Sequence, residues 1–207
     1  MADQTKILLE NLTFPEGPRW HEGRLYFSDF YAHEVVAVDM AGQRETIVEV
    51  PGQPSGLGWT PDGRLLVVSM TDRRLLRLDP GGLVEVADLS ALANYHCNDM
   101  VVDEQGGAYV GNFGFNSHDG SEFKAADLIR VDPDGSVSVA AAGLAFPNGS
   151  VITPDGGTLI VGETRGNILS AWNRAPNGTL SNRRVWADLG AGFPDGICLD
   201  AEGAVWV

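Results

Sequence analysis

One short motif recurs five times along this chain and constrains its fold more than any other feature. Each copy begins with a turn, continues through alternating apolar residues, turns again at a glycine and enters a second apolar run. Equivalent positions lie 39 to 50 residues apart, which is typical of folds that repeat one supersecondary unit. The five copies are 14–29, 53–69, 96–112, 146–163 and 193–207, anchored at Gly17, Gly56, Asp99, Gly149 and Gly196.

Two further segments with alternating apolar residues follow the motif in each of the first four repeats. In the first repeat they are Glu34–Met40 and Glu45–Val50, which flank a turn at 41–43. A period of two predicts β-strands, and four strands per repeat of this length predict the blade of a β-propeller. We therefore predict an all-β fold with one propeller domain over residues 1–207. Its predicted blade units are about 13–50, 51–93, 94–143, 144–190 and 191–207.

The fifth unit stops at Val207, inside its second predicted strand. A propeller normally closes its ring, because closure protects strand edges that would otherwise be unpaired. We therefore expect an incomplete N-terminal portion of a six-bladed propeller, with four blades and the start of a fifth. The segment Lys6–Asn11 is interpreted as a separate outer strand that precedes the first unit and would complete a last blade arriving from the C-terminus.

Composition excludes several classes of partner. The 28 acidic and 14 basic residues give a net charge of −14, which disfavours binding to nucleic acids or anionic membranes. The sequence offers neither a signal peptide nor a transmembrane helix. Cys97 and Cys198 belong to no CxxC pair, so we expect small buried thiols in a cytoplasmic protein rather than a disulfide bridge or a catalytic thiol. The sequence leaves the oligomeric state open.

One position of the repeat carries an oxygen-bearing side chain in every copy. These residues are Glu16, Ser55, Asn98, Asn148 and Asp195. The first strand of each propeller blade lines the central channel, so we expect the five side chains to face one axis. Pro-Asp-Gly is also an ordinary turn, but the copy at 194–196 begins an innermost strand, unlike those at 61–63 and 154–156. Such carboxylate, amide and hydroxyl oxygens suit a hard divalent cation.

The sequence resembles the senescence-marker-protein/gluconolactonase family, which includes regucalcin-like and luciferin-regenerating proteins. The matching segments are Phe14–Pro18, Cys97–Asp99, Gly111–Phe115, Phe146–Gly149 and Phe193–Gly196. The resemblance implies a six-bladed propeller that binds one divalent metal ion in its channel and hydrolyses lactones. It implies Glu16, Asn148 and Asp195 as metal ligands and Asn98 as a residue near metal and substrate. Ca²⁺ is the first choice of ion, with Mg²⁺, Mn²⁺ and Zn²⁺ as alternatives.

Two regions depart from the family pattern. His96 stands where some sugar-lactone members carry an arginine that grips substrate hydroxyls, so we expect it either to contact substrate more weakly or to lie at the rim. The polar segment 116–126 lengthens the third repeat and is interpreted as a loop over the channel mouth, or as a plain surface insertion. Its candidate substrate contacts are His118 and Glu122. Tyr95, Phe113 and Phe115 are expected either to pack in the core or to line a substrate pocket.

Lactone hydrolysis needs an activated water and stabilisation of the oxyanion that develops. The sequence has no GxSxG nucleophile motif, so a covalent intermediate is not expected. By the resemblance, Asp195 would bind the metal with one oxygen and accept a proton with the other. Glu16 is the second candidate for the base, because metal ligation lowers the basicity of a carboxylate. A small-molecule lactone is then the partner.

Two other classes of function remain open at this point. One is a non-catalytic propeller that binds a protein or sugar around a structural metal ion. The other is an esterase- or phosphotriesterase-like propeller that uses the same metal on a different substrate.

Overall fold

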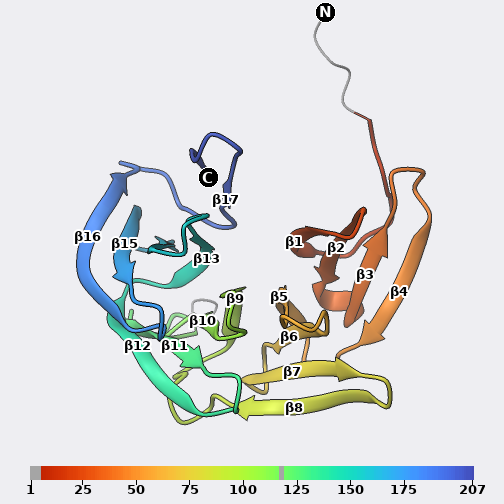
Figure 1. Cartoon of the computed structure of the whole chain (residues 1–207), viewed down its shortest axis with the longest axis horizontal. Helices are drawn as coiled ribbons and strands as arrows, with labels where there is room; N and C mark the ends of the chain where they lie inside the picture. The colour runs from red at the N-terminus through yellow and green to blue at the C-terminus, as the bar shows by residue number, and fades with distance from the viewer. Residues whose placement is uncertain (1–5, 117–118) are drawn as a thin grey trace, which may run out of the picture.

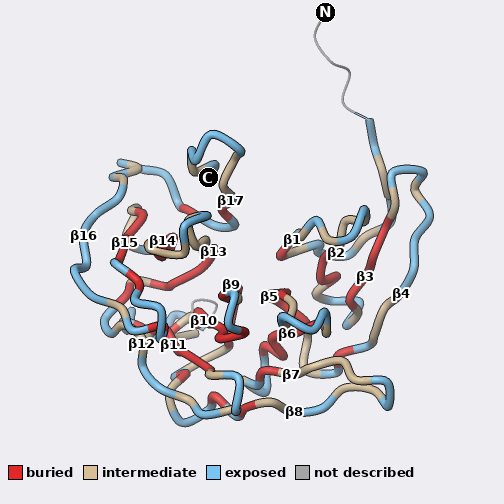
Figure 2. The backbone as a smooth tube through the Cα atoms, viewed as in Figure 1, coloured by how far each residue is buried: buried red, intermediate tan, exposed pale blue. Residues whose placement is uncertain are grey.

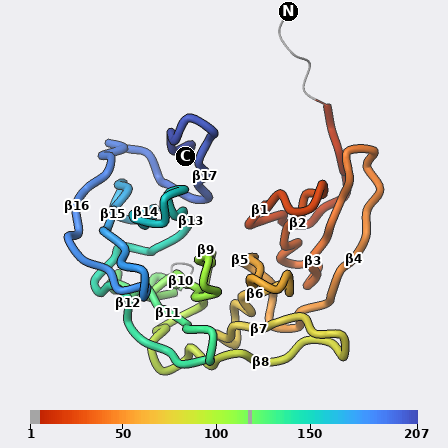
Figure 3. The backbone as a smooth tube through the Cα atoms, viewed as in Figure 1, coloured from red at the N-terminus to blue at the C-terminus, as the bar shows by residue number. Residues whose placement is uncertain are grey.

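The computed structural model describes residues 6–116 and 119–207, and its regular structure is almost entirely β-sheet. Four four-stranded sheets and one two-stranded sheet stand around a common axis in an open arc (Figure 1). Each sheet is an antiparallel meander in chain order, and the chain passes from one blade to the next in sequence (Figure 3). The predicted all-β propeller, with four blades and the start of a fifth, is confirmed. The total of six blades stays a prediction.

The strands have the following bounds. The first blade contains β1 (Pro15–His21), β2 (Arg24–Asp29), β3 (Glu34–Val38) and β4 (Arg44–Glu49), with the 3-10 turn η1 (Phe30–Ala32) after β2. The second contains β5 (Pro54–Trp59), β6 (Leu65–Ser69), β7 (Arg74–Asp79) and β8 (Gly82–Asp88). The third contains β9 (Cys97–Val102), β10 (Ala108–Asn112), β11 (Ala126–Val131) and β12 (Val137–Leu144). The fourth contains β13 (Pro147–Ile152), β14 (Thr158–Glu163), β15 (Ile168–Arg174) and β16 (Leu180–Asp188), and the last sheet pairs β17 (Cys198–Leu199) with β18 (Val205–Trp206).

The hydrophobic core lies between neighbouring blades. One cluster joins Val35 of the first blade to Leu57 and Val67 of the second. Similar clusters join the second blade to the third, the third to the fourth and the fourth to β17 and β18. Buried residues follow the inner strands, whereas the residues of the outermost strands β4, β8, β12 and β16 are exposed or half-buried, apart from Ala87 and Leu144 (Figure 2). The blades therefore stabilise one another through contacts that are distant in sequence.

Two of the glycines that anchor the repeat are required because the innermost strands pass very close to each other. A Cβ atom on Gly56 would lie 2.5 Å from the backbone nitrogen of Met100. A Cβ atom on Gly149 would lie 2.4 Å from the carbonyl oxygen of Asp195. At these two positions the next blade excludes a side chain, so packing around the channel explains the glycine.

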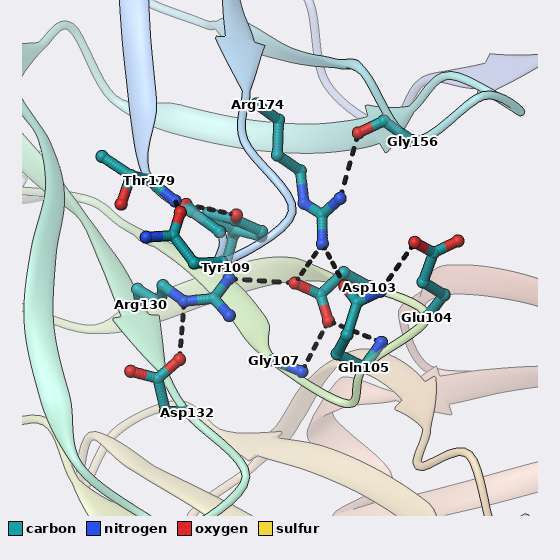
Figure 4. A network of polar contacts seen from close by, with 12 residues as sticks. Asp103, Glu104, Gln105, Gly107, Tyr109, Arg130, Asp132, Gly156, Arg174 and Thr179 are labelled. Atoms are coloured by element: carbon teal, nitrogen blue, oxygen red, sulfur yellow. Dashed lines mark hydrogen bonds and ion pairs between the residues drawn. The ribbon is translucent and has the colours of Figure 1, made fainter.

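A buried ion-pair network joins the third and fourth blades at the ends of β9 and β13 that lie away from the predicted oxygen ring (Figure 4). Oδ2 of Asp103 accepts hydrogen bonds from Nη1 of Arg130 at 3.0 Å and Nη2 of Arg174 at 2.7 Å. The guanidinium of Arg130 also lies over the ring of Tyr109, 4.9 Å from its centre. Because both arginines find a carboxylate, the buried charges are compensated.

The segment Lys6–Asn11 forms no strand with the sheets that the structure describes. Its side chains Leu8 and Leu9 pack on the cluster of Phe27, Val36 and Val38 in the first blade. The place of this segment in a last blade stays a prediction. Cys97 and Cys198 are both free thiols; Cys97 is buried as expected, but Cys198 is exposed, contrary to the expectation of two buried thiols. Among the residues that the structure describes, no helix has the length and apolar character needed to span a bilayer.

Candidate metal centre and active site

The fold places the oxygen-bearing residues of the repeat around one end of the channel. Glu16, Ser55, Asn98 and Asn148 are each the second residue of an innermost strand, and Asp195 lies shortly before β17. The first four line a channel cavity of about 280 Å³. Glu16, Asn98, Asn148 and Asp195 together line a second cavity of about 500 Å³, here called the mouth cavity. The structure therefore brings together residues from four repeats that are up to 179 positions apart.

Hydrogen bonds hold several of these side chains in place. Nδ2 of Asn148 donates to Oδ1 of Asp195 at 2.7 Å and to Oγ1 of Thr164 at 3.2 Å. Thr164 in turn donates to the carbonyl oxygen of Pro194 at 2.7 Å, so the fourth blade fixes the segment that carries Asp195. Oγ of Ser55 donates to Oδ1 of Asn98 at 3.5 Å, which is the long limit of a hydrogen bond.

The electrostatics of the ring favour a cation. The pKa of Glu16 is raised to about 7, first by burial and then by the charges of Asp195 and Asp99, while the hydrogen bond from the Gly17 N–H opposes the shift. Two carboxylates thus repel each other in a half-buried site, and a positive ion between them would relieve that repulsion. The oxygen-only donor set fits a hard divalent ion.

A metal site in this ring would need amide oxygens in addition to carboxylates. Within residues 6–116 and 119–207, no group of three or more His, Cys, Asp or Glu side chains is placed to hold a metal ion. The two carboxylates of the ring would therefore need the amide oxygen of Asn148 as a third ligand. This combination is the one that the sequence resemblance implies.

A second charged pair lies beneath the ring. Nη2 of Arg19 lies 2.6 Å from Oδ1 of Asp99 and also donates to the carbonyl oxygen of Met100 at 2.9 Å. Both Arg19 and Asp99 line the channel cavity. The arginine compensates the charge of a buried carboxylate that directly follows Asn98. Sequence reasoning missed this pair because its members are 80 residues apart.

The mouth cavity contains some of the expected substrate contacts. His96 lines it and stacks on Tyr95, with ring centres 4.0 Å apart, and Phe113 lines it as well. Glu122 is exposed on the loop between β10 and β11 and is not one of the described lining residues. Phe115 instead contacts Phe123, with ring centres 5.5 Å apart. His118 lies outside the described residues.

A second position of the repeat supplies further residues that line the mouth cavity. In each of the four blades, the residue directly after the second strand lines this cavity. These residues are Phe30, Met70, Phe113 and Thr164. They lie beside the beginning of the first strand because the two strands are antiparallel, as in the pairing of Pro147 with Glu163.

The fold and the site define a β-propeller with carboxylate and amide oxygens at the end of its channel and a cavity above them. The chain belongs to the SMP-30/gluconolactonase/LRE-like family, whose model matches residues 14–207. It is 26% identical to the gluconolactonase of Zymomonas mobilis over 96% of this chain and 65% of that protein. It is 27% identical to the pentonolactonase XacC of Haloferax volcanii over 98% of this chain and 68% of that protein.

A solved structure of regucalcin from Agrobacterium tumefaciens, described as a calcium-binding protein, has a TM-score of 0.82 to this chain. The two are 26% identical, and the match covers 97% of this chain and 69% of regucalcin. The chain therefore spans about two thirds of the length of the curated relatives it matches.

Proposed function

We propose that this protein hydrolyses a lactone at the mouth of the channel with the help of one divalent cation. The observation that carries the proposal is the convergence of Glu16, Asn148 and Asp195, with the buried amide of Asn98 beside them. The names of the relatives, gluconolactonase and pentonolactonase, support a cyclic ester as substrate. The calcium-binding description of regucalcin supports Ca²⁺ as the ion.

The proposed ligands are Glu16, Asn148 and Asp195. The chemistry that a bound divalent cation would supply is polarisation of the lactone carbonyl and stabilisation of the developing oxyanion. The carboxylates of Glu16 and Asp195 must both be ionised when the cation is bound. The electrostatic cost of placing them together is then offset by the charge of the ion.

Asp195 is the proposed general base. The Asn148 amide holds Oδ1 of Asp195, which fixes the carboxylate and leaves its other oxygen to accept a proton from water. Asp195 is exposed, so water reaches it. Glu16, the other carboxylate of the ring, remains the second candidate for the base.

Asn98 is the proposed substrate contact within the ring. Its Nδ2 is buried and has no hydrogen-bond partner among the described residues. A buried donor without a partner is unfavourable in a folded protein, and a bound carbonyl oxygen would satisfy it. His96 lies above it in the mouth cavity and is a further proposed contact.

The test is pH-stat assay of small lactones with protein that has been treated with a chelator and then supplied with Ca²⁺. Hydrolysis should be lost with the chelator and return with the ion. Asp195→Asn should lower kcat by about 10²–10⁴-fold, the usual contribution of a positioned base. Glu202→Gln, which changes an exposed acid of the same repeat, is the matched control and should keep the wild-type rate. Wild-type turnover in Asp195→Asn would refute the assignment.

A further inference from the structure

A collar of side chains surrounds the mouth cavity above the oxygen ring. Four of its members lie two residues before a ring residue in the sequence, and they are Phe14, Gln53, His96 and Phe146. The other four directly follow the second strand of each blade, and they are Phe30, Met70, Phe113 and Thr164. Each blade thus contributes one side chain from each position, and the collar is as much a product of the repeat as the ring beneath it.

Most of this collar is apolar. Four of its eight side chains are phenylalanines and a fifth is Met70. On the first blade, the ring centres of Phe14 and Phe30 are 5.7 Å apart in an edge-to-face arrangement, and Tyr31 lies beside both. On the third and fourth blades, Phe113 and Phe146 stack with centres 4.4 Å apart. Aromatic surfaces therefore lie on both sides of the same cavity.

Three side chains of the collar are polar, namely Gln53, His96 and Thr164, and the exposed Arg165 lines the same cavity. The hydroxyl of Thr164 donates to the carbonyl oxygen of Pro194 and accepts from Asn148, so its single donor is used. The imidazole of His96 stacks on Tyr95. The hydroxyl groups of a sugar lactone that lie against the five apolar side chains would lose hydrogen bonds to water that those side chains cannot replace.

We propose that the collar is a specificity site for a lactone with an aryl or alkyl substituent, rather than for a polyhydroxylated sugar lactone. The ester group would lie at the oxygen ring, and the substituent would lie between the aromatic side chains of the first blade and those of the third and fourth. Burial of an apolar group against aromatic rings favours binding through the area removed from water and through ring contacts. This inference rests on the proposed lactone hydrolysis and specifies its substrate class.

The test compares three lactones with the same six-membered ring. They are δ-valerolactone, δ-phenyl-δ-valerolactone and glucono-δ-lactone, assayed with the full chain in the presence of Ca²⁺. We expect kcat/KM for the phenyl compound to exceed that for each of the others by about tenfold or more. Equal or faster hydrolysis of glucono-δ-lactone would overturn the inference and leave the proposed function intact.

Two variants test whether the preference for the phenyl compound arises at the collar. Phe14 is 46% exposed, so Phe14→Ala should fold, and it should lower kcat/KM for the phenyl compound by about tenfold and reduce its advantage over δ-valerolactone. Trp20 is another exposed aromatic residue of β1, but it does not line the described mouth cavity. Trp20→Ala should leave all three rates at the wild-type values. Loss of the preference in Trp20→Ala, or its retention in Phe14→Ala, would contradict the assignment.

A binding measurement separates this inference from catalysis. The lactam analogue of the phenyl compound hydrolyses far too slowly to be consumed, and its binding to chelator-treated protein can be followed by calorimetry. We expect binding to the wild type and at least about tenfold weaker binding to Phe14→Ala. If no lactone is hydrolysed, the proposed function is refuted. If wild type and Phe14→Ala bind the lactam equally well, the collar is refuted as the specificity site.

Discussion

The guanidinium of Arg19 lies 2.6 Å from Oδ1 of Asp99, which ties β1 of the first blade directly to β9 of the third. The second blade lies between these two along the chain, so the pair crosses the channel below the oxygen ring. The carboxylate of Asp99 is almost fully buried. Its neighbour Asn98 belongs to the ring, and the ion pair therefore stabilises the base of the candidate site.

Replacing Arg19 tests this role. Arg19→Leu leaves the Asp99 carboxylate buried without its cation, and we expect the free energy of unfolding to fall by about 2 kcal/mol. Arg19→Lys should recover part of the loss. The matched control is Arg24→Leu, because Arg24 pairs with an exposed Glu45 at 2.8 Å and such pairs contribute about 0–1 kcal/mol. Denaturant unfolding gives all three values, and equal stability of Arg19→Leu and wild type would contradict the role.

The anchoring glycines give a second prediction. Gly149→Ala would place a methyl group 2.4 Å from the carbonyl oxygen of Asp195, so the fourth blade and the segment of Asp195 must separate. We expect a loss of about 1–3 kcal/mol in unfolding free energy, together with weaker binding of Ca²⁺ by calorimetry. Gly81→Ala meets no atom within 4 Å and is the control. A wild-type melting temperature for Gly149→Ala would be incompatible with this close approach.

The buried network around Asp103 predicts how stability depends on pH. Burial would raise the pKa of Asp103, but hydrogen bonds from Arg174, Arg130 and the Gly107 N–H hold it below its ordinary value. The folded state therefore binds a proton less readily than the unfolded chain. The resulting stabilisation is complete above the pKa of the unfolded chain, about 4, and disappears as the pH falls through the lower folded-state pKa.

Asp103→Asn should remove this contribution. At pH 7 we expect the variant to be less stable than wild type by about 3–5 kcal/mol, because the buried Arg174 loses its carboxylate and Arg130 keeps only that of Asp132. Below pH 4 the two unfolding free energies should converge. The exposed neighbour Glu104 provides the control Glu104→Gln. Denaturant titrations from pH 7 to pH 2 measure the curves, and a constant difference at every pH would argue against the ion pairs.

The two cysteines should differ in reactivity. Burial raises the pKa of Cys97 to about 12, whereas Cys198 is exposed. Because the thiolate is the reactive form, an aromatic disulfide reagent at pH 8 should modify one thiol per folded chain and two after denaturation. Cys198→Ser should leave no thiol reactive in the folded protein. Rapid modification of two thiols would show that the third blade opens around Cys97.

The sequence predicted the architecture because the repeat is local and strong. Anchoring positions such as Gly17 and Gly56 recur every 39 to 50 residues, and alternating residues mark the strands between them. The same register indicated which residues belong to the ring, since equivalent positions in a propeller face one axis. The strand predicted at Lys6–Asn11 stays a prediction, because strand formation also needs a partner and its predicted partner is a last blade.

Tertiary structure alone decided how the repeats meet. The pair of Arg19 with Asp99, the hydrogen bond of Asn148 to Asp195 and the network around Asp103 all join residues from different blades. The sequence alone did not reveal these contacts, because the packing of one blade on the next sets them rather than any pattern within a blade. The period of the chain determined that a channel forms and which residues begin its inner strands. The distances between blades determined which charges are paired, which are left for an ion, and which apolar side chains surround the mouth.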